Sequence, residues 1–363
     1  MAIILILTNN IGGLHSFRKE VVKDIVDKGY SVFISTPDDD PRKEYFEGIG
    51  CQVIKTEFNR RGTNPLADFK LMLAYRKLIK RFKPNAVLTY TIKPNIYGGM
   101  ASRMCHVPQL ANVTGLGDAL ENPGLLQKLS VTLYRIGLSK AKRVFFQNSS
   151  NRDTAIRLRI ANESSFLLPG SGVNLKHHVC QPYPADGVVK FLYIGRMLKD
   201  KGIEEYFHTA ETIKSKYPNT EFQILGNVEG DYQEQLKELV EAGIINHLGT
   251  TTDVRPFIGA VHCTIMPSYH EGMSNVNLES AANGRPVITT NVPGCRETVD
   301  DGISGFLVEA RNAESLTDAV ERFVNLPYER KVEMGKAGRQ KVEREFDRQI
   351  VVDAYLREIQ ALS

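Results

Sequence analysis

The feature that most constrains the fold is an alternation of strand-like and helix-like segments, which runs through the chain twice. Short apolar, β-branched stretches alternate with longer amphipathic ones. Strands separated by helices of this length form right-handed βαβ units around a parallel sheet. The strands expected in the first half are 3–7, 30–36, 85–90, 109–114 and 143–148. A glycine turn is expected after the first of them, followed by helices over 17–29 and 41–50.

The alternation is interrupted once, by a segment rich in Gly, Pro and Ser at 167–187. It then restarts, with strands expected at 189–195, 220–226, 245–249, 261–267 and 285–291 and one or two helices within 342–362. We therefore expect an α/β protein of two Rossmann-like domains that face each other across a cleft. The first domain is expected to consist of 1–175 and 348–363, and the second of 186–347. A linker is expected at 176–185. Because ligands bind beyond the carboxyl ends of parallel strands, the cleft is the expected site.

Composition describes a soluble globular protein of two ordinary domains. The 363 residues are 42% hydrophobic and 24% charged, which argues against disorder and against a membrane-spanning chain. The apolar run Ala2–Leu7 is far shorter than the ~20 residues of a membrane helix, and it has no basic leader of the kind a signal peptide carries. The five scattered cysteines, none in a CxxC pair, favour reduced thiols over disulfides or a zinc site.

The two halves differ strongly in charge. Residues 1–181 hold 26 Lys+Arg against 14 Asp+Glu, a net charge of about +12, whereas the remainder has about −8. The basic density is highest within 59–84, where the basic residues border an apolar helical pattern. This segment has two interpretations: a solvated helix packed on a sheet, or a face for an anionic acceptor or a membrane surface.

Two loops after expected strands of the second half suit a nucleotide diphosphate. Arg196 and Lys201 follow one strand and precede a helix, where two cations and the helix dipole would stabilise phosphate charge. After another strand, Gly226 opens a glycine-containing loop, 226–230, that would admit a base or ribose at close range. In the first half, the glycine turn at 9–17 lacks the GxGxxG spacing of a dinucleotide site.

A third loop, HEGMSNVNLE (270–279), sets two glutamates eight positions apart. Ser274 is a suitable N-cap for a helix that ends at Gly284, and its first residues would offer free N–H groups to an anion. Glu271 precedes this anion site and Glu279 lies on the second turn, so the two carboxylates span ~12 Å or somewhat less. That spacing matches the hexose and the ribose of a nucleotide sugar. The alternative is an exposed loop acid and a surface helix acid.

The motifs GSGVN (170–174), YIGRMLKDKG (193–202) and the stretch 270–309 resemble the retaining glycosyltransferases of family 4, which have the GT-B fold. The resemblance covers essentially the whole chain. It implies that Glu271 contacts the donor sugar, that Glu279 binds the ribose, and that Arg196 and Lys201 bind the diphosphate. It also implies that the terminal helix crosses back onto the first domain. The expected catalytic residues are Arg196, Lys201 and Glu271, and the expected donor-binding residues are Gly12, Gly13, Gly172, Gly226, Gly272, Met273, Ser274, Asn275 and Glu279.

Within the first domain, TYTIKPNIYGG (89–99) resembles a segment of bacterial polysaccharide and lipid-linked-oligosaccharide transferases. The nearest likeness is to N-acetylgalactosaminyltransferases that extend undecaprenyl-diphosphate-linked sugars. Thr114 stands where many relatives carry a histidine that reaches the reacting sugar. The acceptor-binding residues expected from this resemblance and from the basic segment are Lys93, Asn95, Thr114, Arg60 and Arg61.

The resemblance implies retaining transfer of a hexosyl group, N-acetylgalactosaminyl in particular, from a UDP-sugar. The acceptor would be a lipid-diphosphate-linked sugar at the cytoplasmic face of the bacterial inner membrane, where the enzyme would be peripheral. No cofactor or metal is expected, because Arg196, Lys201 and the helix start at Ser274 can stabilise the leaving diphosphate. The acidic run Asp38–Asp40 is interpreted as a solvated loop. A UDP-sugar epimerase of the same architecture and a non-catalytic nucleotide-sugar-binding protein are the alternatives.

Overall fold

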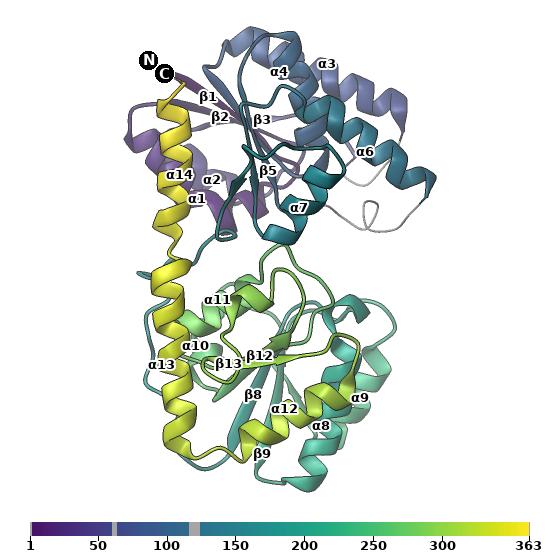
Figure 1. The fold of residues 1–363 in the computed structure, drawn as a ribbon, viewed down its shortest axis with the longest axis vertical. Helices are drawn as coiled ribbons and strands as arrows, with labels where there is room; N and C mark the ends of the chain where they lie inside the picture. Colours follow the sequence, from purple (N-terminus) through teal and green to yellow (C-terminus); the bar gives the residue numbers. More distant parts are fainter. Residues whose placement is uncertain (1, 60–63, 116–123, 363) are drawn as a thin grey trace. The chain divides into compact units, whose positions relative to one another are not determined.

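The computed structural model describes residues 2–59, 64–115 and 124–362. The chain divides into two compact units (Figure 1). Unit 1 consists of residues 1–171 and 349–363, and unit 2 consists of residues 172–348. The expected alternation of strands and helices is confirmed in both units, each of which contains one parallel sheet.

Unit 1 is built on a seven-stranded sheet with the order β3-β2-β1-β4-β5-β6-β7. Its strands are β1 (Ile3–Leu7), β2 (Ser31–Thr36), β3 (Gln52–Lys55), β4 (Ala86–Tyr90), β5 (Gln109–Val113), β6 (Arg143–Phe146) and β7 (Phe166–Leu167). Its helices are α1 (Ile11–Asp27), α2 (Lys43–Gly48), α3 (Pro65–Phe82), a π-helical turn η1 (Pro94–Gly98), α4 (Gly99–Met104), α6 (Leu125–Leu138), α7 (Ser149–Arg157) and α14 (Arg348–Gln360).

Helices cover both faces of this sheet because the side chains of a strand alternate between its faces. Ile4 and Ile6 of β1 are buried in a cluster that includes residues of α1 and α14. Leu5 and Leu7 are buried in a second cluster with residues of α3, η1 and α6. Both faces of β1 are thus apolar, as a strand buried on both sides requires.

The terminal helix α14 belongs to unit 1, as the resemblance implied. Val351, Val352 and Tyr355 are buried beside Ile4 and Ile6 of β1. Tyr355 also donates a hydrogen bond to the side chain of Asn112 on β5. The last segment of the described chain therefore completes the core around the first strand.

Unit 2 is built on a six-stranded sheet with the order β10-β9-β8-β11-β12-β13. Its strands are β8 (Val189–Ile194), β9 (Thr220–Leu225), β10 (Ile245–His247), β11 (Cys263–Met266), β12 (Val287–Thr290) and β13 (Gly305–Val308). Its helices are the 3₁₀ turns η2 (Lys199–Lys201) and η3 (Arg296–Thr298), and α8 (Ile203–Lys216), α9 (Gln233–Glu241), α10 (Arg255–Gly259), α11 (Asn275–Ala282), α12 (Ala313–Val324) and α13 (Tyr328–Glu345).

Two expectations need correction. The first concerns the glycine turn after β1, because Gly12 and Gly13 lie in the first turn of α1. Asn10 caps this helix: its side-chain Oδ1 accepts a hydrogen bond from the Gly13 N–H at 2.9 Å. The cap starts the helix six residues earlier than the expected start at Phe17, since it satisfies an amide that would otherwise lack a partner.

The second correction concerns the linker at 176–185, which lies within unit 2. The guanidinium of Arg285, fully buried, donates to the backbone oxygens of Gln181 at 3.2 Å and Pro182 at 2.6 Å. It also donates to three other backbone oxygens, those of Gly259, Asn283 and Gly284. A segment held by buried hydrogen bonds of this kind is part of the folded unit rather than a free connection.

None of the helices in the described part of the chain is both long enough and apolar enough to span a bilayer.

Candidate donor-binding site

Except for Gly172, the expected donor residues of unit 2 lie in the loops at the carboxyl ends of β8, β9 and β11 or in α11, the helix that follows the last of these loops. The loop after β8 ends at Gly202, whose φ is +72°. A Cβ at this position would lie 2.1 Å from the backbone oxygen of Pro267, which follows β11. Glycine alone allows this approach. The Tyr269 N–H then donates to the Asp200 backbone oxygen at 2.9 Å, which fastens the two loops together.

This contact between loops pairs Lys201 with Glu271. The Lys201 Nζ lies 2.8 Å from the Glu271 Oε1, and both side chains are 18% exposed. An ammonium has three donor hydrogens, so Lys201 can keep this bond and still donate to a phosphate oxygen. Two of the three expected catalytic residues thus form one partly buried ion pair.

Arg196 has a different acidic partner, which the sequence analysis did not identify. Its Nη1 lies 3.1 Å from the Glu229 Oε2, and both side chains are about half exposed. The loops that carry them are joined, because the Met197 N–H donates to the Asn227 backbone oxygen at 2.9 Å. An acid within the glycine-containing loop 226–230 was the sequence signal for this pair.

Gly226 does lie very close to another group, but this group belongs to the protein's own backbone. A Cβ there would lie 1.8 Å from the Gly195 backbone oxygen, at the end of β8. Gly226 is therefore required for the packing of the β8 and β9 loops. We assign it this structural role, and its expected approach to a base or ribose stays a prediction.

The predicted cap and end of the helix after β11 are confirmed. Ser274 is the N-cap of α11, and its Oγ accepts from the Asn277 N–H at 3.4 Å. The helix ends at Ala282, and Gly284 follows with a φ of +76°. The helix starts here because the Ser274 side chain accepts a hydrogen bond from one of the first N–H groups, which have no acceptor within the helix. It ends here because glycine readily adopts the left-handed conformation that follows a helix.

The expectation of three free amides at this helix start is corrected for Ser274. Its N–H donates to the Gly294 backbone oxygen at 2.7 Å. Among the described residues, no hydrogen-bond acceptor is found for the N–H groups of Met273 and Asn275. An anion at this helix start would therefore have two amides available to it, not three.

The loop after β12 supports the segment that carries Glu271 and Gly272. Gly294 has a φ of +83°, and a Cβ there would lie 2.3 Å from the Glu271 backbone oxygen. The Glu297 Oε2 accepts from the Gly294 N–H at 2.8 Å and holds this loop in place. The G..E pattern at 294–297, part of the stretch that carried the resemblance, is the sequence signal for this support.

Glu279 lies on the second turn of α11 with a half-buried side chain. Burial raises the pKa of its carboxyl to about 7, although the charge of Arg348 opposes this shift. Within the described residues the carboxylate forms no hydrogen bond and no ion pair. A desolvated carboxylate without a partner would be stabilised by two hydroxyl donors of a ligand.

The glycines expected in unit 1 and at the boundary of unit 2 are tightly packed. A Cβ on Gly12 would lie 2.0 Å from the Arg42 guanidinium, and the N–H of Gly13 is used by the α1 cap. Gly172 has a φ of +63°, and a Cβ there would lie 2.6 Å from the Arg348 Cα. In these contacts all three serve packing or capping.

The two acceptor candidates after β4 have protein partners. The Lys93 Nζ lies 2.6 Å from the Asp68 Oδ1, and both side chains are 12% exposed. Asn95 is fully buried: its Oδ1 accepts from the Thr89 hydroxyl at 2.7 Å, and its Nδ2 donates to the Asn112 backbone oxygen at 2.7 Å. We therefore correct the assignment of Asn95, which holds β4 and β5 together and presents no group to an acceptor.

Thr114 lies directly after β5 and is half-buried. With the amide of Gln147 oriented to satisfy both neighbours, its nitrogen donates to the Thr114 backbone oxygen at 3.3 Å and its oxygen accepts from Arg18 at 3.0 Å. Arg18 is buried, a position that the sequence analysis did not single out. The remaining acceptor candidates, Arg60 and Arg61, lie outside the described residues.

The acidic run after β2 forms ion pairs, as a solvated loop commonly does. Asp40 pairs with Arg42, and Asp39 pairs with Lys43. The Arg42 side chain and its backbone N–H lower the pKa of Asp40 to about 2.

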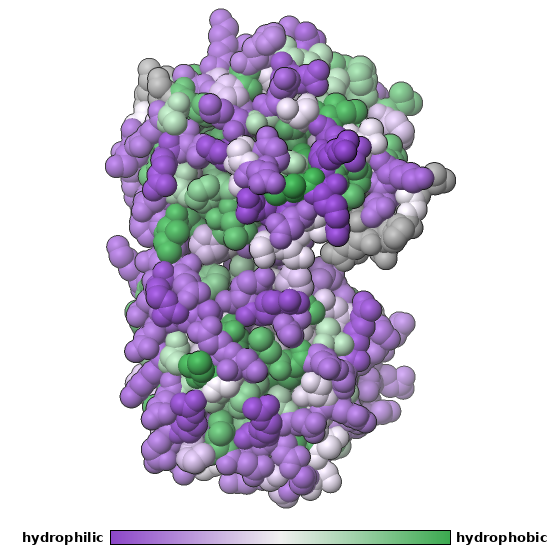
Figure 2. Space-filling view, viewed as in Figure 1, coloured by the Kyte–Doolittle hydropathy of each residue, from purple (hydrophilic) through white to green (hydrophobic). Residues whose placement is uncertain are grey.

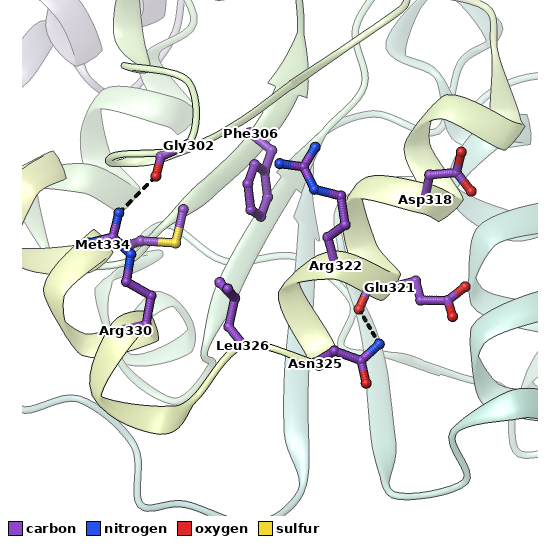
Figure 3. A pocket seen from close by; sticks show the side chains of 9 residues that line it. All are labelled: Gly302, Phe306, Asp318, Glu321, Arg322, Asn325, Leu326, Arg330 and Met334. Carbon is purple, nitrogen blue, oxygen red and sulfur yellow. Dashed lines mark hydrogen bonds between the residues drawn. The ribbon is translucent and has the colours of Figure 1, made fainter.

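A cavity of about 710 Å³ lies elsewhere in unit 2 (Figure 3). Its lining comes from the start of β13, the end of α12 and the start of α13, with the Arg322 guanidinium 4.3 Å from the centre of the Phe306 ring. None of the expected donor residues lines this cavity, so it is separate from the candidate site.

Comparison with solved structures defines the class of fold. A glycosyltransferase from Rickettsia africae matches with a TM-score of 0.81 at 20% identity, over 99% of this chain and 98% of that chain. Anabaena Alr3699/HepE, solved in complex with UDP and glucose, matches with a TM-score of 0.79 at 16% identity, over 99% of each chain. The two parallel-sheet units thus have the GT-B fold of glycosyltransferases.

Family models identify the family. Residues 182–341 match the model of glycosyl transferases group 1, and residues 4–148 match the glycosyl transferase 4-like model. The two matches together span most of the chain, which therefore belongs to these glycosyltransferases and is a hexosyltransferase.

Two curated relatives match over most of their own length. The N,N'-diacetylbacillosaminyl-diphospho-undecaprenol alpha-1,3-N-acetylgalactosaminyltransferase of Campylobacter jejuni is 24% identical over 326 residues, which cover 85% of each chain. The capsular polysaccharide biosynthesis glycosyltransferase CapM of Staphylococcus aureus is 27% identical over 345 residues, 89% of this chain and 88% of that one. The chain is thus related to transferases of lipid-linked sugars.

Proposed function

We propose that this enzyme transfers an N-acetylhexosaminyl group, N-acetylgalactosaminyl in particular, from a UDP-sugar to an undecaprenyl-diphosphate-linked sugar. The observation that carries the proposal is the arrangement around α11 in unit 2. The Lys201–Glu271 ion pair lies at the loop before this helix. The carboxylate of Glu279, which has no partner among the described residues, lies on its second turn. The name of the Campylobacter jejuni relative supports the choice of sugar and acceptor.

The donor would lie along α11. The ammonium of Lys201 and the guanidinium of Arg196 would balance the charge of the diphosphate, together with the amides of Met273 and Asn275. Glu271 would accept from a hydroxyl of the donor sugar while it holds Lys201, and Glu279 would accept from the ribose hydroxyls.

The reaction breaks the bond between the anomeric carbon and the diphosphate oxygen and forms a bond to the acceptor oxygen. We propose that the acceptor hydroxyl attacks from the face that the diphosphate leaves, so that the configuration is retained. Its proton passes to the departing phosphate oxygen, and the products are UDP and the extended lipid-linked sugar. Arg196 and Lys201 would stabilise the charge that develops on UDP, so this step is proposed without a metal.

The decisive experiment incubates the purified protein with a panel of UDP-sugars and with synthetic polyprenyl-diphosphate sugars or free sugars as acceptors. The expected result is UDP release and an extended lipid acceptor, with an α linkage seen by NMR. Conversion of the UDP-sugar to its epimer without acceptor would instead identify an epimerase. Tight binding of UDP-sugar with neither reaction would identify a binding protein.

A further inference from the structure

Tyr269 ties together the two segments that carry the Lys201–Glu271 ion pair. It lies in the loop between β11 and α11, two residues before Glu271. Its N–H donates to the Asp200 backbone oxygen at 2.9 Å, and its hydroxyl donates to the Glu205 Oε1 at 2.7 Å. Asp200 and Glu205 stand on either side of Lys201 in the chain. Tyr269 thus holds the Lys201 segment at two points, one through its backbone and one through its side chain.

Glu205 is an unusual partner, because it is a carboxylate in the protein interior. Charged side chains ordinarily stay at the surface, and purple, hydrophilic side chains cover much of the visible face of unit 2 in Figure 2. Glu205, in the first turn of α8, is only 8% exposed. Its Oε1 accepts from the Tyr269 hydroxyl, whereas its Oε2 is buried and forms no hydrogen bond with any described residue. Burial of such a carboxylate costs free energy, so stability alone does not explain this residue.

Arg311 covers the face of the Tyr269 ring at a cost to its own backbone. It follows β13 and directly precedes Asn312, the N-cap of α12. Its guanidinium carbon lies 4.9 Å from the centre of the ring, which is a cation–π contact. Its φ is +61°, in the left-handed region that glycine adopts far more readily than arginine. A strained residue that contacts a side chain of the site points to a role beyond the turn itself.

We propose that the Tyr269 side chain, held by Glu205 and Arg311, is a positioning group. It fixes the geometry of the Lys201–Glu271 ion pair and does not itself touch the donor. Glu205 anchors the hydroxyl to the start of α8, and Arg311 holds the ring from its face. The inference rests on the proposed function for the roles of Lys201 and Glu271, and it deepens that function by naming the residues that act through them.

The position of this ion pair matters most in the transition state. The ammonium must face the phosphate as charge develops on it, and the carboxylate must face the sugar that is being transferred. Misplacement of such groups by about 1 Å can lower a rate by about a hundredfold. Donor binding depends less on the pair, since Arg196, the amides of α11 and Glu279 would contact other parts of the donor. Loss of the positioning group should therefore lower kcat more than it raises KM.

Steady-state kinetics tests the proposal, with whichever UDP-sugar and acceptor of the panel the full-length parent converts. Tyr269→Phe removes the hydroxyl but keeps the ring. It should lower kcat about tenfold to a hundredfold and change the donor KM by less than about threefold. Glu205→Leu, which removes the acceptor at similar volume, should lower kcat likewise. Glu205→Gln keeps a side-chain oxygen for the hydroxyl and should recover at least about a third of the parent's kcat.

Arg311→Gly separates positioning from stability. Glycine relieves the strained backbone, so the free energy of unfolding should stay close to the parent's while kcat falls by about threefold or more. The matched control is Arg159→Gly in unit 1, an exposed arginine with a φ of +54°. It relieves a similar strain and should leave kcat and KM at the parent's values. Chemical denaturation and circular dichroism establish that each variant is folded.

The proposal is overturned if Tyr269→Phe keeps the parent's kcat, if Glu205→Gln loses as much as Glu205→Leu, or if Arg159→Gly loses as much as Arg311→Gly. A rise in the donor KM of Tyr269→Phe at an unchanged kcat would also contradict it, because the side chain would then serve donor binding alone. These outcomes leave the proposed function standing. A parent that converts no UDP-sugar would instead overturn the proposed function and this inference together, so the two failures are distinguished.

Discussion

Glu279 combines partial burial with the absence of a hydrogen-bond partner among the described residues. Because its folded-state pKa of about 7 lies above the ordinary value of 4.5, ionisation of the carboxyl destabilises the folded protein as pH rises between these two values. Hydroxyl donors from a ligand would favour the ionised form and offset this cost. The residue thus couples stability, pH and donor binding.

The first prediction concerns this coupling. UDP-N-acetylgalactosamine should bind more tightly as pH rises from 6 to 8, because the carboxylate is the better acceptor for ribose hydroxyls. Glu279→Gln should weaken binding at pH 8 by roughly tenfold to a hundredfold and remove most of the pH dependence. Isothermal titration calorimetry measures both effects.

The free energy of unfolding gives a second test, because it depends on whether folding raises or lowers the pKa of Glu279. Glu279→Gln should raise the free energy of unfolding at pH 8 and leave it nearly unchanged at pH 4.5, since the ionisation cost is absent below the unfolded pKa. The ribose assignment fails if the variant binds the donor as tightly as the parent at pH 8.

Arg285 illustrates a residue whose role is invisible in the sequence. Its guanidinium donates to five backbone oxygens and lies 5.3 Å from the centre of the Tyr183 ring. We predict that Arg285→Lys lowers the free energy of unfolding of unit 2 by about 2–5 kcal/mol, because a lysine cannot reach all of these acceptors. Chemical denaturation measures the loss. The control is Arg103→Lys, which replaces an exposed arginine and should change the free energy of unfolding by less than about 0.5 kcal/mol.

At the scale of elements, the candidate site depends on how closely the loops after β8 and β11 pack. Gly202 permits this contact, and Gly243 provides a matched control with the same backbone conformation. Their φ angles are +72° and +70°, but a Cβ on Gly243 would meet no atom within 4 Å.

We predict that Gly202→Ala weakens UDP-sugar binding by about tenfold or more, because its Cβ displaces the loop that carries Lys201. It should also destabilise unit 2 by about 1–3 kcal/mol more than Gly243→Ala, which suffers the backbone strain alone. Gly243→Ala should bind the donor as the parent does. Equal donor affinity in the two variants would show that the loop contact does not position Lys201.

At the scale of the whole molecule, the two parallel sheets were predictable because their central strands are continuous apolar runs bounded by glycine or polar residues. The α11 cap was also predictable, because Ser274 lies between an expected strand and a helical pattern. The edge strands β3, β7 and β13 were missed, since they have only two to four residues and both residues of β7 are exposed. The structural role of Asn95 was beyond prediction, because it depends on Thr89 and Asn112, which only the folded sheet brings to this side chain. Glu229 was missed although its loop was singled out, because the sequence does not show which cation the acid pairs with.

The last prediction concerns α14. Tyr355 is fully buried, contacts Phe145 and Tyr90, and binds Asn112. Tyr355→Ala should lower the stability of unit 1 by about 3–5 kcal/mol and speed hydrogen exchange in β1 and β5. UDP-sugar binding, which we place in unit 2, should survive at temperatures where unit 1 remains folded. Loss of exchange protection in unit 2 strands alone would contradict this assignment.

Because α14 follows unit 2 in the chain but belongs to unit 1, the two units become complete in the reverse of their order in the sequence. During synthesis, unit 2 can fold once residue 348 has left the ribosome, whereas β1 must wait for the residues after 348 to cover Ile4 and Ile6. The nascent first unit thus exposes apolar surface for the whole time that unit 2 is being translated. During translation, chaperones should therefore bind mainly to the first unit, which is the part of the protein that is made first.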